Sequence, residues 1–469
     1  MMMNLSQAAL AVGGRVQGMP AELAGEFAAE FTTVSTDTRT IATGDLFVAL
    51  AGERFDGHDY LAAAAAQGAV AALVDAAWAG HHPETPLPRV VVDDTRLALG
   101  RLAAHWRAGF DIPLVGITGS NGKTTVKEMT AAILRAQAAL DGDSGPDAVL
   151  ATQGNLNNDI GLPLTLLRLR PCHRAAVIEM GTNHPGEIAY LTALARPTVA
   201  LVNNAQRAHL AGMGGLMAVA EEKGAIYGGL AAAGVALVNA DDAYCEYWRG
   251  LNTERTVLSF GLDPVADVAG RYEERGYASL VRLSTPEGEA EFLLPMPGRH
   301  NVRNALAATA AALAACASLE AVVAGLSGFT GVKGRLQRKA ALGGAVLLDD
   351  SYNANPDSVR AAIDVLAMTP GRSILVLGDM GEIGERAGQL HDEIGGYAKS
   401  QGVDQIFGLG ELAETAVHNF GKGGRHFRRV ETLVEALLPE LDAHTVVLVK
   451  GSRFMRMERV ADAITNGEK

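Results

Sequence analysis

Short apolar runs alternate with Ala-rich stretches of helical period in the first part of the chain, up to about residue 110. Apolar runs bounded by polar or glycine-containing segments are typical of buried strands, and longer amphipathic stretches are typical of helices. The strands predicted on this basis are 45–50 and 70–74, and the helices are 60–67 and 95–108. Their order indicates a small α/β domain.

The pattern changes near residue 111 and again at a glycine-containing segment, 331–338, which predicts a hinge. Between these points strand and helix patterns alternate, with strands predicted at 113–117, 177–180, 199–202 and 235–239. Beyond the hinge the alternation is regular, with strands predicted at 345–348, 374–377, 405–409 and 446–449, as in a doubly wound, Rossmann-like sheet. We therefore predict an α/β fold with three domains, 1–110, 111–331 and 332–469.

A glycine-rich turn follows the strand predicted at 113–117 and precedes a helical pattern. Backbone N–H groups of such a turn can bind phosphates, a lysine such as Lys123 can reach the outer phosphates, and a hydroxyl such as that of Thr124 can ligate Mg²⁺. Ile117 stands where the usual Walker A motif has its first glycine, so this is a shorter loop. The alternative is a structural turn with a solvated lysine. The predicted nucleotide-binding residues here are Gly119, Ser120, Asn121, Gly122, Lys123, Thr124 and Thr125.

Composition narrows the class of protein. A length of 469 residues suggests about three domains, and 48% hydrophobic residues suffice for well-packed cores. The net charge of -13 and the absence of a long basic block argue against nucleic acid as a partner. Residues 1–11 lack the features of a signal peptide, and the apolar run 305–317 is too short to span a bilayer. We therefore expect a cytoplasmic protein without membrane insertion.

The chain has three cysteines, Cys172, Cys245 and Cys316, which are far apart in sequence and include no Cys-x-x-Cys pair. Their spacing predicts reduced residues of the protein core in a reducing compartment.

Polar residues follow two of the central strands. Glu179 ends an apolar run, and a carboxylate there could hold Mg²⁺ or could equally cap a helix or form an ion pair. His209 lies in a glycine-rich segment after the next apolar run, and a lone histidine is usually structural. Lys223, taken by itself, is typical of a solvated charge on a helix surface.

Several motifs occur in one order along nearly the whole chain. Besides the phosphate loop, they are Asn-Leu-Asn-Asn-Asp-Ile-Gly at 155–161, Asn-His-Pro-Gly-Glu at 183–187, Arg-His-Asn-Val-Arg-Asn at 299–304, Lys-Gly-Arg-Leu at 333–336, Asp-Ser-Tyr-Asn-Ala-Asn-Pro at 350–356, Leu-Gly-Asp-Met-Gly-Glu at 377–382 and Lys-Gly-Ser-Arg at 450–453. In these motifs the chain resembles the Mur ligase family. The phosphate loop alone is shared with the folylpolyglutamate synthases, whereas the full set is specific to one branch of the Mur ligases.

This resemblance implies an ATP-dependent ligase that adds D-alanyl-D-alanine to UDP-N-acetylmuramoyl-tripeptide through an acyl phosphate, in peptidoglycan synthesis. It also implies a monomer with a uridine-nucleotide domain, a central P-loop-type ATPase domain and a C-terminal ligase domain. Chemistry of this kind requires charge neutralisation more than a covalent protein nucleophile. The lack of a nucleophile motif is consistent with it.

The resemblance further implies roles for individual residues. Lys123 would stabilise the transferring phosphoryl group, and Thr124 and Glu179 would ligate one Mg²⁺. His209 would ligate a second Mg²⁺ together with Lys223, which would be converted to a carbamate. A carbamate turns a cation into a carboxylate-like oxygen donor, which accounts for a lysine at a metal site.

Other implied residues bind the nucleotide or the substrates. Asn301, Asn304, Arg335 and Asp350 would contact the nucleotide, and Asn353 and Asn355 would contact the incoming substrate. In the first domain, Ser35, Asp37 and Arg39 would contact the uridine nucleotide. The alternative for these three is a side-chain-capped turn with a surface ion pair. For His300 a role in helix capping and packing is an equally good interpretation.

Three alternative functions stay open. The sibling ligase that adds the third amino acid keeps the first domain, but its motif for a diamino acid is replaced here by Asn353-Ala-Asn-Pro. A folylpolyglutamate synthase lacks the uridine-type domain, whereas about 110 residues precede the phosphate loop here. A P-loop nucleotide switch would have no use for the third domain.

Overall fold

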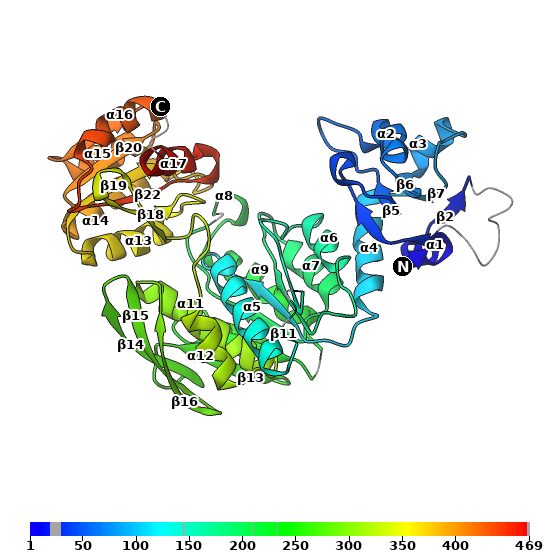
Figure 1. Ribbon diagram of the computed structural model, residues 1–469, viewed down its shortest axis with the longest axis horizontal. Helices are drawn as coiled ribbons and strands as arrows, with labels where there is room; N and C mark the ends of the chain where they lie inside the picture. Colours follow the sequence, from blue (N-terminus) through cyan, green and yellow to red (C-terminus); the bar gives the residue numbers. More distant parts are fainter. Residues whose placement is uncertain (19–29, 144, 146, 209, 232, 467–469) are drawn as a thin grey trace.

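The computed structural model describes residues 1–18, 30–143, 145, 147–208, 210–231 and 233–466. Three α/β domains follow one another, with the first and the C-terminal domain at opposite ends of the molecule and the central domain between them (Figure 1). This confirms the predicted fold class. The exact boundaries near residues 110 and 331 stay predictions.

The first domain contains a five-stranded sheet of order β2-β7-β6-β5-β4, parallel except for β2. Its strands are β2 (Arg15–Gln17), β4 (Thr33–Ser35), β5 (Asp45–Val48), β6 (Ala71–Asp75) and β7 (Arg89–Val92). The accompanying helices are α1 (Leu5–Val12), α2 (Leu61–Ala66) and α3 (Ala76–His81), and β1 (Met3–Asn4) pairs with β3 (Glu30–Phe31). The predicted strands and helix of this region are therefore present, each shifted by a residue or a few.

Helix α4 (Thr95–Arg107) joins the first domain to the central one. It packs against α1 on one side and against α6 (Gly161–Leu166) and α7 (Glu187–Ala195) of the central domain on the other. Trp106 Nε1 donates to the carbonyl of Leu169 at 3.1 Å, and Arg107 Nε donates to that of Ala195 at 3.2 Å. Both domains contribute to one continuous apolar cluster around this helix. The helix thus fixes the orientation of the two domains rather than serving as a loose linker.

The central domain has a nine-stranded sheet of order β16-β15-β14-β13-β12-β11-β8-β10-β9. The strands are β8 (Leu114–Thr118), β9 (Val149–Ala151), β10 (Ala175–Glu179), β11 (Val199–Val202), β12 (Val235–Asn239), β13 (Thr256–Gly261), β14 (Val268–Arg275), β15 (Ala278–Thr285) and β16 (Gly288–Leu294). Helices α5 (Lys123–Leu140), α11 (Arg299–Ala314) and α12 (Leu319–Ser327) pack on one face. Helices α7, α8 (Leu210–Met213), α9 (Leu216–Gly224) and α10 (Cys245–Gly250) belong to the other side of the domain.

The last three strands of this sheet differ from the predicted alternation of strands and helices. β14 to β16 are antiparallel and extend the parallel sheet as an arm. Buried and exposed residues alternate along them, which is the pattern of a sheet with one covered face. This alternation of apolar and polar residues was already present in the sequence, and it would have predicted antiparallel strands here.

The C-terminal domain has a six-stranded sheet of order β17-β18-β22-β19-β20-β21, parallel except for the edge strand β17. The strands are β17 (Gln337–Ala340), β18 (Val346–Asp350), β19 (Arg372–Gly378), β20 (Gln405–Leu409), β21 (Gly424–Phe427) and β22 (Thr445–Lys450). Helices α13 (Pro356–Met368), α14 (Ala387–Ser400) and α15 (Ala413–Phe420) cover one face, and α16 (Val430–Leu437) and α17 (Glu458–Asn466) the other. The doubly wound sheet is confirmed, with β17 occupying part of the segment predicted as a hinge.

Within that hinge segment, Gly331 and Gly334 have φ angles of 83° and 68°. These left-handed conformations disfavour residues with a Cβ, so the two glycines suit this connection.

The cysteines are all free, but two of the three are not core residues. Cys172 and Cys316 are exposed and Cys245 is partly buried, which corrects the expectation of a core position. Among the described residues, no helix combines the length and the apolar character needed to cross a bilayer.

Candidate active site

The phosphate loop lies at the carboxyl end of β8, next to the ends of β10 and β11. Gly119 has φ 153°, and a Cβ there would lie 2.9 Å from the Cβ of Asn203. Gly122 has φ 80°, and a Cβ there would lie 2.4 Å from Asn304 Oδ1. Glycine is therefore required at both positions by backbone conformation and by space. Helix α5 begins at Lys123, directly after the loop, so its N-terminal N–H groups face the region where phosphates would bind.

Side chains after β11 hold this loop in place. Asn121 N donates to Asn204 Oδ1 at 2.9 Å, and Asn121 Nδ2 donates to Gln206 Oε1 at 2.6 Å. Gln206 N also donates to Ser120 Oγ at 2.9 Å. The loop conformation is thus fixed by protein contacts before any ligand binds. The sequence predicted no role for Asn204 or Gln206, because their contacts with the loop depend on strand ends that are adjacent only in the fold.

Lys123 Nζ donates to the carbonyl of Gly119 at 2.7 Å. Desolvation by the surrounding protein lowers the pKa of Lys123, Glu179 opposes this shift, and Arg335 adds to it by repulsion. The ammonium therefore lies over its own loop, close to Glu179 and Arg335. A bound phosphate group would offset the repulsion between the two cations.

Thr124 and Glu179 form a second cluster. Thr124 Oγ1 donates to Glu179 Oε2 at 2.9 Å, and Asn157 Nδ2 donates to Glu179 Oε1 at 2.8 Å. Glu179 is only 2% exposed, and its backbone N–H donates to Thr152 Oγ1 at 2.9 Å. A hydroxyl and a carboxylate side by side are oxygen donors of the kind that Mg²⁺ prefers. The chemistry of this pair therefore fits the expected metal.

Among the described residues, no group of three His, Cys, Asp or Glu side chains is placed to hold a metal ion. Mg²⁺ usually keeps several waters and is completed by substrate phosphates, so one carboxylate and one hydroxyl can suffice. His209, predicted as a ligand of a second ion, lies outside the described residues.

Lys223 is 2% exposed, near the end of α9. Its position corrects the solvated helix surface that its local sequence suggested. Within the described part of the chain, its ammonium has no hydrogen-bond or ion-pair partner. Desolvation lowers its pKa well below the usual value, and repulsion from Lys123 lowers it further, against the opposing effect of Glu222. The side chain is therefore held near the phosphate loop in a form that favours the neutral amine.

The predicted nucleotide residues gather on α11 and at the end of β18. Asn301 and Asn304 are buried, and Asn304 Oδ1 accepts from Asn203 Nδ2 at 3.1 Å. Asp350 Oδ2 accepts from Lys450 Nζ at 2.5 Å, and Asp350 Oδ1 accepts from Leu336 N at 3.1 Å. Together with Arg335 and His300 these residues line a cavity of about 210 Å³ that extends to Gly122 and Thr124.

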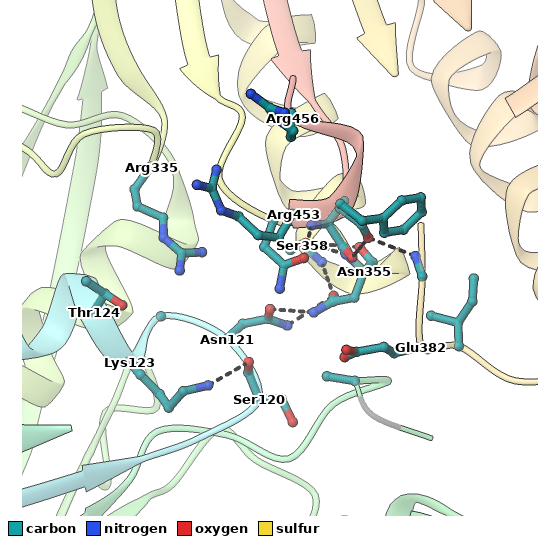
Figure 2. A pocket seen from close by; sticks show the side chains of 18 residues that line it. Ser120, Asn121, Lys123, Thr124, Arg335, Asn355, Ser358, Glu382, Arg453 and Arg456 are labelled. Carbon is teal, nitrogen blue, oxygen red and sulfur yellow. Dashed lines mark hydrogen bonds between the residues drawn. The ribbon is translucent and has the colours of Figure 1, made fainter. Parts of the chain in front are cut away.

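A larger cavity of about 630 Å³ opens on the phosphate loop between the central and C-terminal domains (Figure 2). Its central-domain wall consists of residues 120–124 and Ala208. Arg335, from the hinge, and residues of the C-terminal domain complete it, namely Asn353, Ala354, Asn355, Ser358, Gly381, Glu382, Ile383, Ser452, Arg453, Phe454 and Arg456. The structure therefore brings Asn353 and Asn355 to the phosphate loop. It adds the loops around Glu382 and Arg453, whose motifs were noticed in the sequence without an assigned role.

The residues of the first domain that were predicted to bind the uridine nucleotide lie away from the two cavities at the phosphate loop. Ser35 Oγ accepts from Asp37 N at 3.2 Å, and Arg39 Nη2 pairs with Asp37 Oδ2 at 2.6 Å. The hydrogen bond from Arg39 lowers the pKa of Asp37 to about 2. This is the geometry of a capped turn with a surface ion pair, and no described first-domain residue lines either of the two cavities at the phosphate loop. Uridine binding by these three residues stays a prediction.

Three family descriptions match successive parts of the chain. They are "Mur ligase family, catalytic domain" at residues 30–107, "Mur ligase middle domain" at 117–312 and "Mur ligase, glutamate ligase domain" at 334–453. Among curated proteins, the UDP-N-acetylmuramoyl-tripeptide–D-alanyl-D-alanine ligase of Haemophilus influenzae is 43% identical, over 95% of this chain and 96% of its own.

Solved structures agree over the whole length. A crystal structure of MurF from Acinetobacter baumannii superposes with a TM-score of 0.88 at 35% identity and covers 98% of both chains. MurF ligase from Thermotoga maritima, solved in complex with ADP, superposes with a TM-score of 0.79 at 25% identity, covering 95% of this chain and 98% of its own. The similarity thus includes all three domains and their arrangement.

Proposed function

This chain belongs to the Mur ligase family, and we propose that it is the ATP-dependent ligase that joins D-alanyl-D-alanine to UDP-N-acetylmuramoyl-tripeptide in peptidoglycan synthesis. The observation that carries this proposal is the identity of 43% to a ligase of that name, maintained over 95% of the chain. Since the match includes the C-terminal domain, it covers the part that would select the incoming dipeptide.

The cavity geometry supports a reaction through an acyl phosphate. The N-terminus of α5 and Lys123 would bind the phosphates of ATP and neutralise charge on the transferring group. Asn301, Asn304 and Asp350 line the smaller cavity, where the rest of the nucleotide would lie, with Arg335 between it and the larger cavity. The peptide carboxylate and the dipeptide amine would then meet in the larger cavity, which residues of two domains line; with substrates bound, these residues would shield a hydrolysable intermediate from water.

We propose that Thr124 and Glu179 hold a Mg²⁺ ion, which when bound neutralises phosphate charge. Their adjacent oxygen donors support this role. We propose also that Lys223 reacts with CO₂ to give a carbamate and that, with His209, it holds a second ion. The support is its burial without a partner among the described residues, because a neutral lysine amine is the form that adds to CO₂.

The remaining assignments follow from the family resemblance. Ser35, Asp37 and Arg39 would contact the uridine nucleotide, and Asn353 and Asn355 the incoming dipeptide. We propose that the enzyme acts as a monomer in the cytoplasm, which is where its nucleotide substrates would be made.

Release of ADP, measured with UDP-N-acetylmuramoyl-tripeptide in the presence and absence of D-alanyl-D-alanine, tests the proposed function. We expect release to depend on both substrates. ADP release that requires a diamino acid and the UDP-N-acetylmuramoyl precursor with only two amino acids would instead indicate the sibling ligase. ADP release that needs neither substrate but responds to a partner protein would indicate a nucleotide switch.

A further inference from the structure

The two cavities at the phosphate loop are separate sites that meet at one point. They share Asn121, Gly122, Thr124, Arg335 and Ser358. The smaller cavity continues toward α11, whereas the larger one continues into the loops of the C-terminal domain after β19 and β22. A group bound deep in the larger cavity would therefore be on the far side of the phosphate loop from the nucleotide.

Four cationic side chains line the described part of the larger cavity, and three of them are engaged. Lys123 donates to the carbonyl of Gly119, Arg335 stacks on the ring of Tyr352 at 4.1 Å, and Arg453 pairs with Glu458 at 3.1 Å. The fourth is Arg456.

Within the described residues, the guanidinium of Arg456 has no hydrogen bond, ion pair or ring contact. Arg456 has φ 52° and ψ 50°, and it follows the short helical turn Arg453–Met455 between β22 and α17. A left-handed conformation is unusual for an arginine, and strained backbone in a cavity wall often accompanies a binding role. Figure 2 shows Arg456 and Lys123 far apart, with Asn355 between them.

An acidic side chain lines the same cavity closer to the phosphate loop. Glu382, in the loop after β19, also has a left-handed backbone, with φ 61°. In Figure 2 its carboxylate extends toward Asn121 and Ser120. The cavity therefore carries a carboxylate beside the phosphate loop, where Lys123 and Arg335 also lie, and the guanidinium of Arg456 away from the loop. A zwitterion with its amine toward the phosphate loop complements this arrangement.

We propose that Arg456 binds the free carboxylate of the acceptor dipeptide and that Glu382 holds its amino group beside the phosphate loop. This inference rests on the proposed function and specifies how the acceptor is oriented. The planar guanidinium can donate two parallel hydrogen bonds to a carboxylate. The orientation places the nucleophilic nitrogen near the site of acyl phosphate formation and the carboxylate away from the negative phosphates.

The test compares D-alanyl-D-alanine with its C-terminal carboxamide as acceptors, in ADP release at saturating ATP and UDP-N-acetylmuramoyl-tripeptide. In the unmodified enzyme the carboxamide should lose about 10- to 100-fold in kcat/KM, as expected for a lost charge-assisted hydrogen bond. Arg456→Ala should lose a similar factor in kcat/KM with D-alanyl-D-alanine itself. Its kcat/KM should then be the same for the dipeptide and for the carboxamide. Arg456→Lys should recover part of the preference for the acid.

Glu382→Gln should raise KM for both acceptors while leaving the ratio between them unchanged. Arg429→Ala is the matched control, because Arg429 is an exposed arginine of the same domain that does not line the cavity; it should behave as the unmodified enzyme.

Equal use of acid and carboxamide by the unmodified enzyme would overturn the proposal without requiring any variant to fold. So would an unchanged preference in Arg456→Ala, or an unchanged KM for the dipeptide in Glu382→Gln. Failure of the proposed function is a different result, in which the unmodified enzyme releases no ADP with either acceptor.

Discussion

Asn121 in the phosphate loop and Asn355 at the start of α13 are joined through their side-chain amides. Asn355 Nδ2 donates to Asn121 Oδ1 at 2.7 Å, and Asn121 Nδ2 lies 3.3 Å from Asn355 Oδ1. The same Asn355 Oδ1 caps α13 by accepting from Ser358 N at 2.9 Å. One side chain therefore fixes the end of a helix in the C-terminal domain and touches the loop that would bind ATP.

These two roles of Asn355 can be separated. Asn355→Ser keeps an oxygen that can cap α13 but is too short to reach Asn121, so we expect reduced turnover with little change in melting temperature. Asn355→Ala should also lose the cap, at a cost of about 1 kcal/mol in stability. Thermal melting and ADP release on both variants make the comparison. Wild-type turnover in Asn355→Ser would show that the contact between the domains is not needed.

Arg207 provides a second connection between the same domains. It pairs with Asp357 of α13 at 2.7 Å and with Glu393 of α14 at 3.4 Å, and all three side chains are only partly exposed. We expect Arg207→Ala to weaken docking of the C-terminal domain and to increase the radius of gyration measured by small-angle scattering. The exchanged pair Arg207→Asp with Asp357→Arg should recover part of the loss, with a coupling free energy of about 1 kcal/mol or more. Equal scattering from Arg207→Ala and the unmodified enzyme would contradict this.

Lys123→Ala should abolish ligation while leaving the fold intact. The substitution removes the ammonium that would neutralise the transferring phosphoryl group, an effect of roughly 10²–10⁴ in rate. Because the hydrogen bonds that Lys123 makes to described residues go to carbonyls of its own loop, circular dichroism and thermal melting should change little. A variant with nearly full kcat would show that this loop does not do the chemistry.

Lys223→Ala should be nearly inactive, and a short carboxylic acid should restore part of the activity by supplying oxygen donors where the carbamate would lie. Activity of the unmodified enzyme should also fall when CO₂ is removed. Lys127 is the matched comparison, since it is equally buried but donates to the Thr152 carbonyl and pairs with Glu128 at 2.7 Å. Lys127→Ala should gain nothing from added acid. A bare ammonium at Lys223 in a crystal with nucleotide and Mg²⁺ bound would count against carbamylation.

His300 should stay neutral well below neutral pH. Burial lowers its pKa to about 4, with Lys450 and Arg303 contributing and Asp350 and Asp364 opposing. An unfolded histidine takes up its proton near pH 6.5, so the native state is disfavoured as the pH falls from about 6.5 toward 4. Titration of the imidazole by NMR should give a midpoint near that low value, and His300→Gln should flatten the fall in stability over this window. A midpoint near 6.5 would show that the ring is solvated.

Sequence reasoning succeeded where the determining interactions are local. The phosphate loop could be predicted because strand, glycine turn and helix follow one another within residues 114–140, and each needs only its own residue types. The position of Glu179 beside the phosphate loop could be predicted because it ends an apolar strand, and parallel strands meet at one edge of the sheet. Its role as a metal ligand stays a prediction. Motif order along the chain then indicated the family, and the comparisons confirm it.

Local pattern alone determined the phosphate loop, the parallel strands and the family, because hydrophobic period and turn chemistry act over short segments. Tertiary packing decided the rest. Lys223 has an ordinary helical neighbourhood in sequence, and its amine becomes buried only when α9 packs against α7 and the neighbouring segments of the folded central domain. Arg207 resembles any exposed arginine until domain docking brings it to α13. Arg456 stays exposed, and its place in the cavity is visible only once the loops after β19 and β22 lie opposite the phosphate loop. The charges around a side chain come from residues that are distant in sequence. The contacts between the charged groups of this site therefore form only in the folded chain.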